Sequence, residues 1–412
     1  MYYVPSAVGC HRPWGGLHIG INRDVNVCCW LVGHENELGD WDNSYHANMR
    51  EVRIDEPYLK SFLNNDGFRY LRRAHMGAER MPKTCTECMK TRGSQGLSEL
   101  KMMPEKDFES AYDATEEDGS YDYREGIRRS VIAFANKCNL ACRMCNPFAS
   151  SKLRRIRDKK PNYEASYKGL DDACQDAENV VDNTEMALFA EDIIPMMYQH
   201  EWLGRTVLVG GEPLLCKETF TFLEKTTMPC HVVTNGTIGV ESKLVKKILD
   251  RGNVVFSFSI DGIKEVNDFQ RLGTDTDIVK KNIADFAKHA RVEIVPVMSV
   301  ITYPKLPEFI AELRGYYNDV GVSNVLFEEV TGKNEMKPQN ISPEILRDVQ
   351  TKLVAIRDEL EGLDELTGIE ENILNYINGA IKWYRPEVST LKPDTNLIQL
   401  FKLQDEDVST YC

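Results

Sequence analysis

The run Asn136-Lys-Cys-Asn-Leu-Ala-Cys-Arg-Met-Cys-Asn-Pro147 decides how the whole sequence is interpreted, because it brings Cys138, Cys142 and Cys145 together in one short stretch. Three thiolates on a tight loop can hold a 4Fe–4S cluster and leave one iron without a protein ligand, since such clusters normally take four cysteines. An open coordination position is where a metal site can do chemistry. The same spacing also fits one face of an α-helix with buried cysteines. The asparagines and Pro147 interrupt the run and favour a metal-binding loop.

Composition sets the outer bounds of the interpretation. A chain of 412 residues is too long for one simple core and predicts two or three domains. The sequence has no apolar run of membrane-spanning length and no secretory signal at its start, so we expect a cytoplasmic protein without a membrane partner. In that compartment the twelve cysteines are better explained by metal ligation than by disulfides. A net charge of −14 argues against a nucleic-acid partner, and the basic stretch 154–160 is interpreted as a solvated helix face or a local basic patch.

The middle of the chain alternates strand-like and helix-like stretches. The predicted strands are 131–135, 206–209, 231–234, 254–260, 292–300 and 324–330, and the predicted helices are 149–157, 185–200, 217–225, 241–251, 278–289 and 306–317. This alternation implies right-handed βαβ units and a parallel sheet. Six such units form an incomplete barrel, in which chemistry gathers at the C-terminal ends of the strands. The polar and acidic stretch 159–184 is interpreted as an insertion.

The two ends of the chain do not show this alternation of strands and helices. Two strand-like runs, 17–21 and 25–29, flank Asn22-Arg23-Asp24 and predict a hairpin. A helix is expected over 58–75, followed by Cys85 and Cys88, and the acidic stretches 115–119 and 121–125 are interpreted as a linker. Beyond residue 335, amphipathic helices are expected over 341–361 and 368–383. We therefore predict an auxiliary domain with linker (1–125), a barrel core (126–335) and a helical extension (336–412).

Polar motifs recur at the predicted strand ends. The second strand ends in Gly210-Gly211-Glu212-Pro213, and glycines there let the backbone approach a ligand closely. In the fourth strand, period-two alternation places Ser257, Ser259 and Asp261 on one face. Polar side chains on a buried strand need hydrogen-bond partners, and the hydroxyls of a ribose would supply them. Serines satisfied by backbone and a helix-capping aspartate are the alternative.

With these motifs in order, the chain resembles a radical S-adenosylmethionine enzyme over residues 126 to about 335. The resemblance implies a partial (β/α)6 TIM-type barrel, which is an α/β fold. It implies that Cys138, Cys142 and Cys145 hold a 4Fe–4S cluster whose open iron binds S-adenosylmethionine. Reductive cleavage of this cosubstrate then gives a 5′-deoxyadenosyl radical, which abstracts a hydrogen atom from the substrate. Such an enzyme needs a one-electron donor, such as a reductase, a flavodoxin or a ferredoxin.

The resemblance also implies roles for single residues. Gly210, Gly211 and Glu212 would meet the methionine amino group, and Arg271 would pair with its carboxylate. A second group of residues is expected at the nucleoside: Ser257, Ser259 and Asp261 at the ribose, Met144 near the adenine, and Asn235, from the Thr234-Asn235-Gly236 motif, in a less defined role. No clear adenine motif is present in the fifth strand.

The N-terminal segment carries a second set of cysteines, which are Cys10, Cys28, Cys29, Cys85 and Cys88. A C-x2-C motif beside other cysteines can bind zinc or a second iron–sulfur cluster. The arrangement resembles the twitch domain, a shortened SPASM auxiliary-cluster domain, which phage and bacterial members place before the barrel. In a phage-encoded enzyme the compartment would be the host cytoplasm. The resemblance favours Cys10, Cys29, Cys85 and Cys88 as ligands, with Cys28 as a competitor of Cys29. Zinc, or reduced structural thiols, remain alternatives.

The substrate class follows from this second resemblance. Auxiliary-cluster relatives often act on peptides or proteins, so a peptide or protein substrate is expected, with a carbohydrate or nucleotide as the rival. The alternative function is a non-catalytic iron–sulfur or zinc protein that keeps the barrel as a binding scaffold. Glu328 and Glu329, at the end of the sixth strand, are interpreted as a possible base at the substrate or as a solvated strand end.

Overall fold

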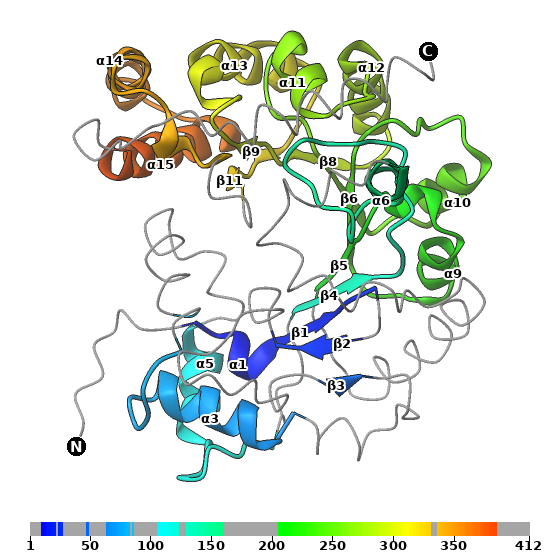
Figure 1. Cartoon of the computed structure of the whole chain (residues 1–412), viewed down its shortest axis with the longest axis vertical. Coiled ribbons are helices and arrows are strands. Elements are labelled where there is room, and N and C mark those ends of the chain that lie inside the picture. Colours follow the sequence, from blue (N-terminus) through cyan, green and yellow to red (C-terminus); the bar gives the residue numbers. More distant parts are fainter. Residues whose placement is uncertain are drawn as a thin grey trace. The chain divides into compact units, whose positions relative to one another are not determined.

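The computed structural model describes residues 10–21, 24–27, 47–48, 63–82, 85, 105–122, 129–159, 205–330 and 336–384 (Figure 1). These residues belong to two compact units. The first unit contains the described residues up to 135, together with 205–210 and 216–230. The second contains 136–159, 211–215 and the described residues from 231 onward. The predicted helix over 185–200 and almost all of the predicted insertion lie outside the described residues.

The strands of the first unit combine core strands with the N-terminal hairpin. β4 (Arg129–Ala133) pairs in parallel with β5 (Arg205–Val209) on one side and with β1 (Gly16–Ile19) on the other. β1 then pairs antiparallel with β2 (Asp24–Asn26), which pairs antiparallel with β3 (Ala47–Asn48). The hairpin expected from the sequence is therefore confirmed. Its parallel pairing with β4 was not expected, because no local pattern announces a contact more than 100 residues away.

The helices of the first unit are α1 (Arg12–Gly15), α3 (Asp66–His75), α5 (Glu105–Asp113) and α9 (Lys217–Lys225). The buried guanidinium of Arg72 on α3 donates hydrogen bonds of 2.6–3.1 Å to the carbonyl oxygens of Gly119, Pro13 and Leu63 and to Asn64 Oδ1. A buried charge is tolerated where its donors are satisfied in this way. Gly119, part of the stretch interpreted as a linker, is thus packed against α3.

Helix α3 begins later than the pattern predicted. The side chain of Asn65 accepts a hydrogen bond from the backbone N–H of Phe68 and caps the helix, so residues 63–65 precede it. Helix α9 has the predicted bounds. Phe222 on α9 packs on Phe134, which follows β4, with ring centroids 5.7 Å apart. This contact joins α9 to the chain segment that follows β4.

The second unit carries the later strands. Neighbouring strands run in the order β10 (Asn324–Val325), β8 (Arg291–Ile294), β7 (Val254–Phe258), β6 (Cys230–Thr234), and β8 is parallel to both β7 and β10. The fifth and sixth strands, predicted as single elements, are each broken in two. Their second halves, β9 (Val297–Met298) and β11 (Glu328–Glu329), form a separate parallel pair. Pro296 lies at the first break, and proline has no N–H to donate to a sheet.

The helices of this unit follow the predicted pattern, with one helix that was not predicted and several ends shifted by two residues. They are α6 (Ser151–Lys159), α10 (Lys243–Arg251), α11 (Lys264–Gln270), α12 (Thr276–Ala287), α13 (Leu306–Glu312), α14 (Pro343–Glu361) and α15 (Gly368–Trp383). No helix was predicted at α11. Helix α6 is shifted two residues toward the C-terminus and α12 two residues toward the N-terminus, and α10 and α14 each begin two residues later than predicted. The predicted helix over 306–317 changes at Leu313 into a π-helical turn, Leu313–Tyr317. Short 3₁₀ turns lie at Pro213–Leu215, Tyr303–Lys305 and Pro338–Asn340.

The fold class is the expected one. The strands are mostly parallel and alternate with helices, which makes an α/β fold, and the described strands do not close into a barrel. The C-terminal helices α14 and α15 pack against each other, as the expected helical extension requires. In the part of the chain that the structure describes, no helix is both long and apolar enough to cross a membrane.

Candidate functional site

The three-cysteine run is an irregular loop after β4 and not a helix. Residues 139–149 consist of a bend at 139, turns at 143–144 and 147–149, and irregular backbone between them, and helix α6 starts at Ser151. The first turn of α6 holds the loop: Cys138 N donates to Ser151 Oγ at 3.1 Å, and Ser150 Oγ donates to the carbonyl oxygen of Leu140 at 2.9 Å. The helical alternative for these cysteines is therefore wrong.

The three thiols interact with one another electrostatically. Burial raises the pKa of the Cys142 thiol, the charge of Arg271 acts to lower this pKa, and Cys145 and Cys138 raise it further. Burial also raises the pKa of Cys138, whose sulfur accepts from the backbone N–H of Leu140 at 3.5 Å. Thiolates crowded together in a buried place need a positive charge nearby, and both Arg271 and a metal centre supply one.

The Gly-Gly-Glu motif packs directly on the cysteine loop. A Cβ on Gly211 would come within 2.4 Å of the Lys137 carbonyl oxygen and within 2.5 Å of the Asn136 carbonyl carbon, so a larger residue cannot fit without a shift. Glu212 N donates to the same Lys137 oxygen at 2.7 Å. Gly210 has a φ of +125°, which glycine alone adopts without strain. At Gly211 the backbone therefore approaches the cysteine loop of the protein itself closely.

The carboxylate of Glu212 is buried and hydrogen-bonded at both oxygens. It accepts from Leu214 N at 3.0 Å, from Thr234 Oγ1 at 2.8 Å and from Asn235 N at 2.6 Å. Burial raises the pKa of Glu212 to about 7, against the opposing effect of these hydrogen bonds and of the charge on Arg271. The negative charge of Glu212 in turn acts on Cys138, which places the carboxylate beside the cysteine loop.

The Thr234-Asn235-Gly236 motif, which follows β6, also contacts the cysteine loop. Asn235 Nδ2 donates to Asn139 Oδ1 at 2.9 Å and lies 4.0 Å from the sulfur of Cys138. Thr237 completes the contact, because its hydroxyl accepts from Asn139 Nδ2 at 2.9 Å. Asn235, one of the predicted site residues, is therefore at the first cysteine of the loop.

The serine-rich strand β7 has the predicted alternation. Phe256 and Phe258 pack on Phe286 of α12, whereas Ser257 turns to the opposite face and lies 3.5 Å from Glu293 Oε2. Ser259 is half-buried, and its backbone N–H donates to the Thr234 carbonyl oxygen at 2.8 Å.

Asp261 and Arg271 form a buried ion pair next to the cysteine loop. Arg271 Nη2 donates to Asp261 Oδ1 at 2.7 Å, and that oxygen also accepts from Val297 N at 2.9 Å. Burial acts to lower the pKa of Arg271, but the charges of Asp261 and Cys142 outweigh it and raise this pKa. The Nε atom of Arg271 is buried and has no hydrogen-bond partner in the part of the chain that the structure describes. It is thus a buried donor for which the described residues supply no acceptor.

Two residues of this site were not predicted from the sequence. Gln270 Nε2 donates to Asp261 Oδ2 at 2.7 Å and to the Val297 carbonyl oxygen at 3.1 Å. Arg143 N donates to the Gln270 carbonyl oxygen at 2.8 Å, and the Arg143 guanidinium lies 4.1 Å from the ring centroid of Phe269. The end of α11 therefore clamps the cysteine loop. Gln270 adjoins the predicted Arg271, but no motif marked it.

The remaining predicted residues are less constrained. Met144 is half-buried on the loop. Of the N-terminal set, Cys10 and Cys85 are half-buried, whereas Cys28, Cys29 and Cys88 lie outside the described residues. Among the residues that are described, no group of three or more His, Cys, Asp or Glu side chains converges on a single metal ion. The ligand set of the second centre therefore stays a prediction.

The donor set of the loop fits a cluster better than a single ion. In an iron–sulfur cluster each cysteine binds its own iron, so the sulfurs need to surround the cluster and not to converge on one point. Three interacting thiols, N–H groups of Leu140 and Asn235 directed at one of them, and the cation of Arg271 suit an anionic cluster. Hydrogen bonds to sulfur tune such centres.

Comparisons with known proteins return structural likenesses at low similarity. No family model matches the sequence, and no curated protein matches it. Native anSMEcpe with bound AdoMet is 18% identical, with 56% of this chain and 61% of that chain covered, at a TM-score of 0.38. Streptococcus suis SuiB bound to precursor peptide SuiA is 14% identical, with 77% and 67% covered, at 0.40. TYW1 with a lysine-pyruvate adduct bound is 12% identical, with 52% and 68% covered, at 0.30.

These similarities are too low to transfer an activity, and the chain matches about 61% of the length of anSMEcpe. The chemistry of the site therefore depends on its own residues.

Proposed function

We propose that the chain is a radical S-adenosylmethionine enzyme whose cluster is held by Cys138, Cys142 and Cys145. The observation that carries this proposal is the convergence of three separate segments on one non-helical cysteine loop. Gly211 and Glu212 pack on Lys137, Asn235 lies at Cys138, and Arg271 acts on Cys142. A structural metal site needs its ligands alone, whereas this loop is surrounded by buried polar groups that can take a cosubstrate.

The chain's own residues would bind and orient the cosubstrate in the following way. The Nε atom of Arg271, which has no partner among the described residues, offers a buried donor to the methionine carboxylate, while Asp261 fixes the guanidinium in place. Glu212 would attract the methionine ammonium group, together with the backbone of Gly210 and Gly211. Ser257, Ser259 and Asp261 would face the ribose, and Met144 the adenine. When bound, the cluster supplies the electron that cleaves the cosubstrate to a 5′-deoxyadenosyl radical.

For the substrate we propose a peptide or protein side chain, and a carbohydrate or nucleotide is the rival. The support for this class is the resemblance of the N-terminal cysteines to an auxiliary-cluster domain. We propose an iron–sulfur cluster for that domain, with zinc as the competing metal. The domain boundaries at 125 and 335 are part of the same proposal.

Anaerobic reconstitution tests the function. The protein is loaded with iron and sulfide, reduced with dithionite and incubated with S-adenosylmethionine, and 5′-deoxyadenosine is measured by chromatography. We expect 5′-deoxyadenosine from the native chain. If none forms while absorbance and iron counts establish an intact cluster at Cys138, Cys142 and Cys145, the alternative of a non-catalytic metal protein is correct.

A further inference from the structure

Helix α6, which follows the cysteine loop, carries a strong local charge opposite in sign to that of the whole chain. Its nine residues contain five basic side chains and one acidic side chain, which leaves a formal charge of +4. The chain as a whole has a net charge of −14. Charge of one sign concentrated on an oppositely charged molecule attracts partners that the rest of the surface repels.

The basic side chains lie on the outer side of the helix. Leu153 and Ile156 are buried and fix the inner face, whereas Arg155 and Lys159 are exposed and Lys152, Arg154 and Arg157 are half-buried. Arg157 pairs with Asp158 at 3.0 Å. Arg154 and Arg155 have no carboxylate partner among the described residues, although Arg155 Nε donates weakly to the Ser151 carbonyl oxygen at 3.4 Å. A helix face that is merely solvated would show the same exposure. The position of α6 in the fold is therefore needed to distinguish a docking surface from a solvated face.

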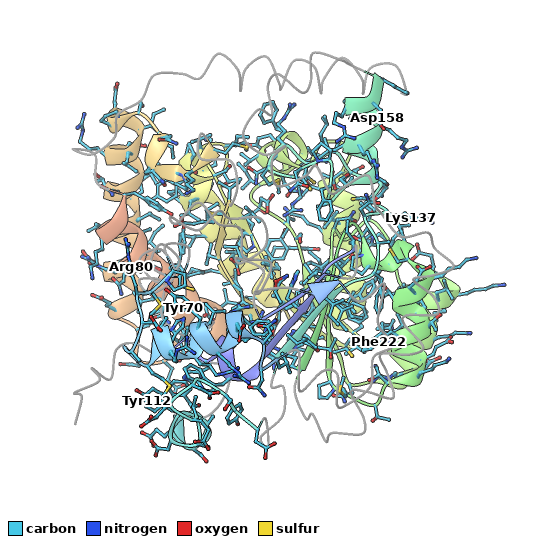
Figure 2. All side chains as sticks on the ribbon, turned by 60° about the horizontal axis from the view of Figure 1, so that its bottom comes forward. Tyr70, Arg80, Tyr112, Lys137, Asp158 and Phe222 are labelled. Carbon is cyan, nitrogen blue, oxygen red and sulfur yellow. The ribbon has the colours of Figure 1, made fainter. Side chains whose placement is uncertain are left out.

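That position is immediately beside the cysteine loop. Ser151, the first residue of α6, accepts from Cys138 N and donates to the Cys138 carbonyl oxygen at 3.3 Å. The ammonium group of Lys152 lies against Gly273, close to Leu140 and Asn139 of the loop. Lys137, one residue before the first cysteine, is exposed, and Figure 2 labels both Lys137 and Asp158. The basic surface therefore continues onto the loop that we propose to hold the cluster.

We infer that this surface, made of Lys137, Lys152, Arg154, Arg155 and Lys159, docks a small acidic one-electron carrier protein. The inference rests on the proposed function, which requires one electron per cleavage event. The carrier is oxidised by one electron, and the cluster beside the surface is reduced by one. Electrostatic complementarity raises the rate of encounter and orients the partner, and both effects weaken as salt screens the charges. The rest of the chain carries a formal charge of −18, which disfavours docking of an acidic carrier over most of it.

The experiment compares two electron sources in the reconstituted full-length enzyme. The double variant Arg154→Glu/Arg155→Glu reverses two charges that do not belong to the proposed cofactor site. Formation of 5′-deoxyadenosine is measured with a reduced acidic flavodoxin over a range of flavodoxin concentrations, and separately with dithionite. We expect the apparent KM for flavodoxin to rise by about tenfold, with dithionite-driven formation unchanged. Raising salt from 50 to 300 mM should weaken the native enzyme's use of flavodoxin more than the variant's.

A matched control lies on another basic helix of the same unit. Lys243→Glu/Lys246→Glu reverses two exposed lysines on α10 and should leave the flavodoxin KM within about twofold. Equal KM values for the α6 variant and the native enzyme would overturn the inference. A native enzyme inactive with dithionite would instead refute the proposed function.

A second class of partner is separated by direct binding. If the surface takes an acidic peptide substrate, a polyglutamate peptide should compete with flavodoxin, and the charge reversal should abolish its binding. We expect polyglutamate to bind more weakly than flavodoxin by at least tenfold, because a rigid carrier presents its charges pre-organised. Equal affinity would contradict docking of a carrier protein.

Discussion

The two cysteine sets of this chain differ in how much surrounding structure defines them. Each cysteine of the C-x3-C-x2-C loop interacts with a residue of the second unit. Asn235 lies at Cys138, and Arg271 acts electrostatically on Cys142. The backbone N–H of Cys145 donates to the carbonyl oxygen of Cys142. In the N-terminal set, Cys10 and Cys85 are described and half-buried. The difference teaches that spacing identifies candidate ligands, whereas the residues around them identify the chemistry.

The largest expected effect is loss of the core cysteines. Changing Cys138, Cys142 or Cys145 singly to alanine should abolish 5′-deoxyadenosine formation, because a cluster with two protein ligands is not held. The measurement is product per enzyme with dithionite, together with iron per chain. Cys230→Ala is the control: this buried thiol donates to the Met228 carbonyl oxygen and is not one of the proposed cluster ligands, so its loss should leave iron and product unchanged. Residual product from a core variant would contradict the assignment.

The next largest effect is expected at the Arg271–Asp261 ion pair beside the C-x3-C-x2-C loop. Arg271→Lys keeps a charge but loses the planar fork that bonds Asp261 and leaves Nε open. We expect kcat/KM for S-adenosylmethionine to fall about 100-fold, equivalent to about 3 kcal/mol, mainly through KM. Arg314→Lys is the matched control, since Arg314 pairs with Glu359 and Glu370 at the surface. A change in kcat with KM intact would remove Arg271 from cosubstrate binding.

The parts of the fold that could be predicted from the sequence are those determined by residues close together in the chain. Helix α15 has its predicted bounds, and the capping box of Thr367 and Glu370 at its start involves only residues that are close in sequence. The strand segments and the alternation along β7 were likewise local. By contrast, α11 is seven residues long and has no side-chain N-cap, so no pattern marked it.

The motifs of the site could be predicted from the sequence, but the contacts that join these motifs to one another could not. Gln270 and Arg143 escaped prediction because their partners lie far away in sequence, as in the hydrogen bond from Arg143 Nε to the Phe269 carbonyl oxygen. The glycines of the Gly-Gly-Glu motif were predicted as a point of close approach. That the neighbour of Gly211 is the backbone at Asn136 and Lys137 could be learned only from the fold.

A smaller effect is expected where the Gly-Gly turn packs on the loop. In Gly211→Ala the new methyl group would meet the Lys137 carbonyl oxygen, and the loop must shift at a cost of about 1–3 kcal/mol. We expect reduced cluster occupancy, measured as iron per chain, and a lower urea midpoint. Gly315→Ala is the control, because nothing lies within 4 Å of its new Cβ. Equal midpoints for the two variants would mean that the contact is not tight in solution.

The second cysteine set should respond more weakly. If Cys10 and Cys85 ligate an auxiliary cluster, changing either to serine should lower iron to the content of the core cluster alone and leave dithionite-driven 5′-deoxyadenosine formation within about threefold. The reason is that cleavage needs the core loop alone. Metal analysis on the Cys138/Cys142/Cys145→Ala protein supplies the reciprocal measurement: remaining zinc without iron would replace the auxiliary cluster by a zinc site.

The smallest effect tests whether the N-terminal region is a packed structure in its own right. His75 on α3 lies edge-on to Trp14 with ring centroids 6.4 Å apart, and burial lowers its pKa from 6.5 to about 4. The unfolded chain therefore takes up a proton below pH 6.5 that the folded chain refuses, so stability falls as pH decreases from about 6.5 toward 4. At pH 5.5 the loss from this group is about 1 kcal/mol. In His75→Gln the urea midpoint should fall less between pH 7 and 5.5 than in the native chain. Parallel curves for His75→Gln and the native protein would mean that His75 is protonated in the folded state and that its surroundings are wetter than the packing around Trp14 implies.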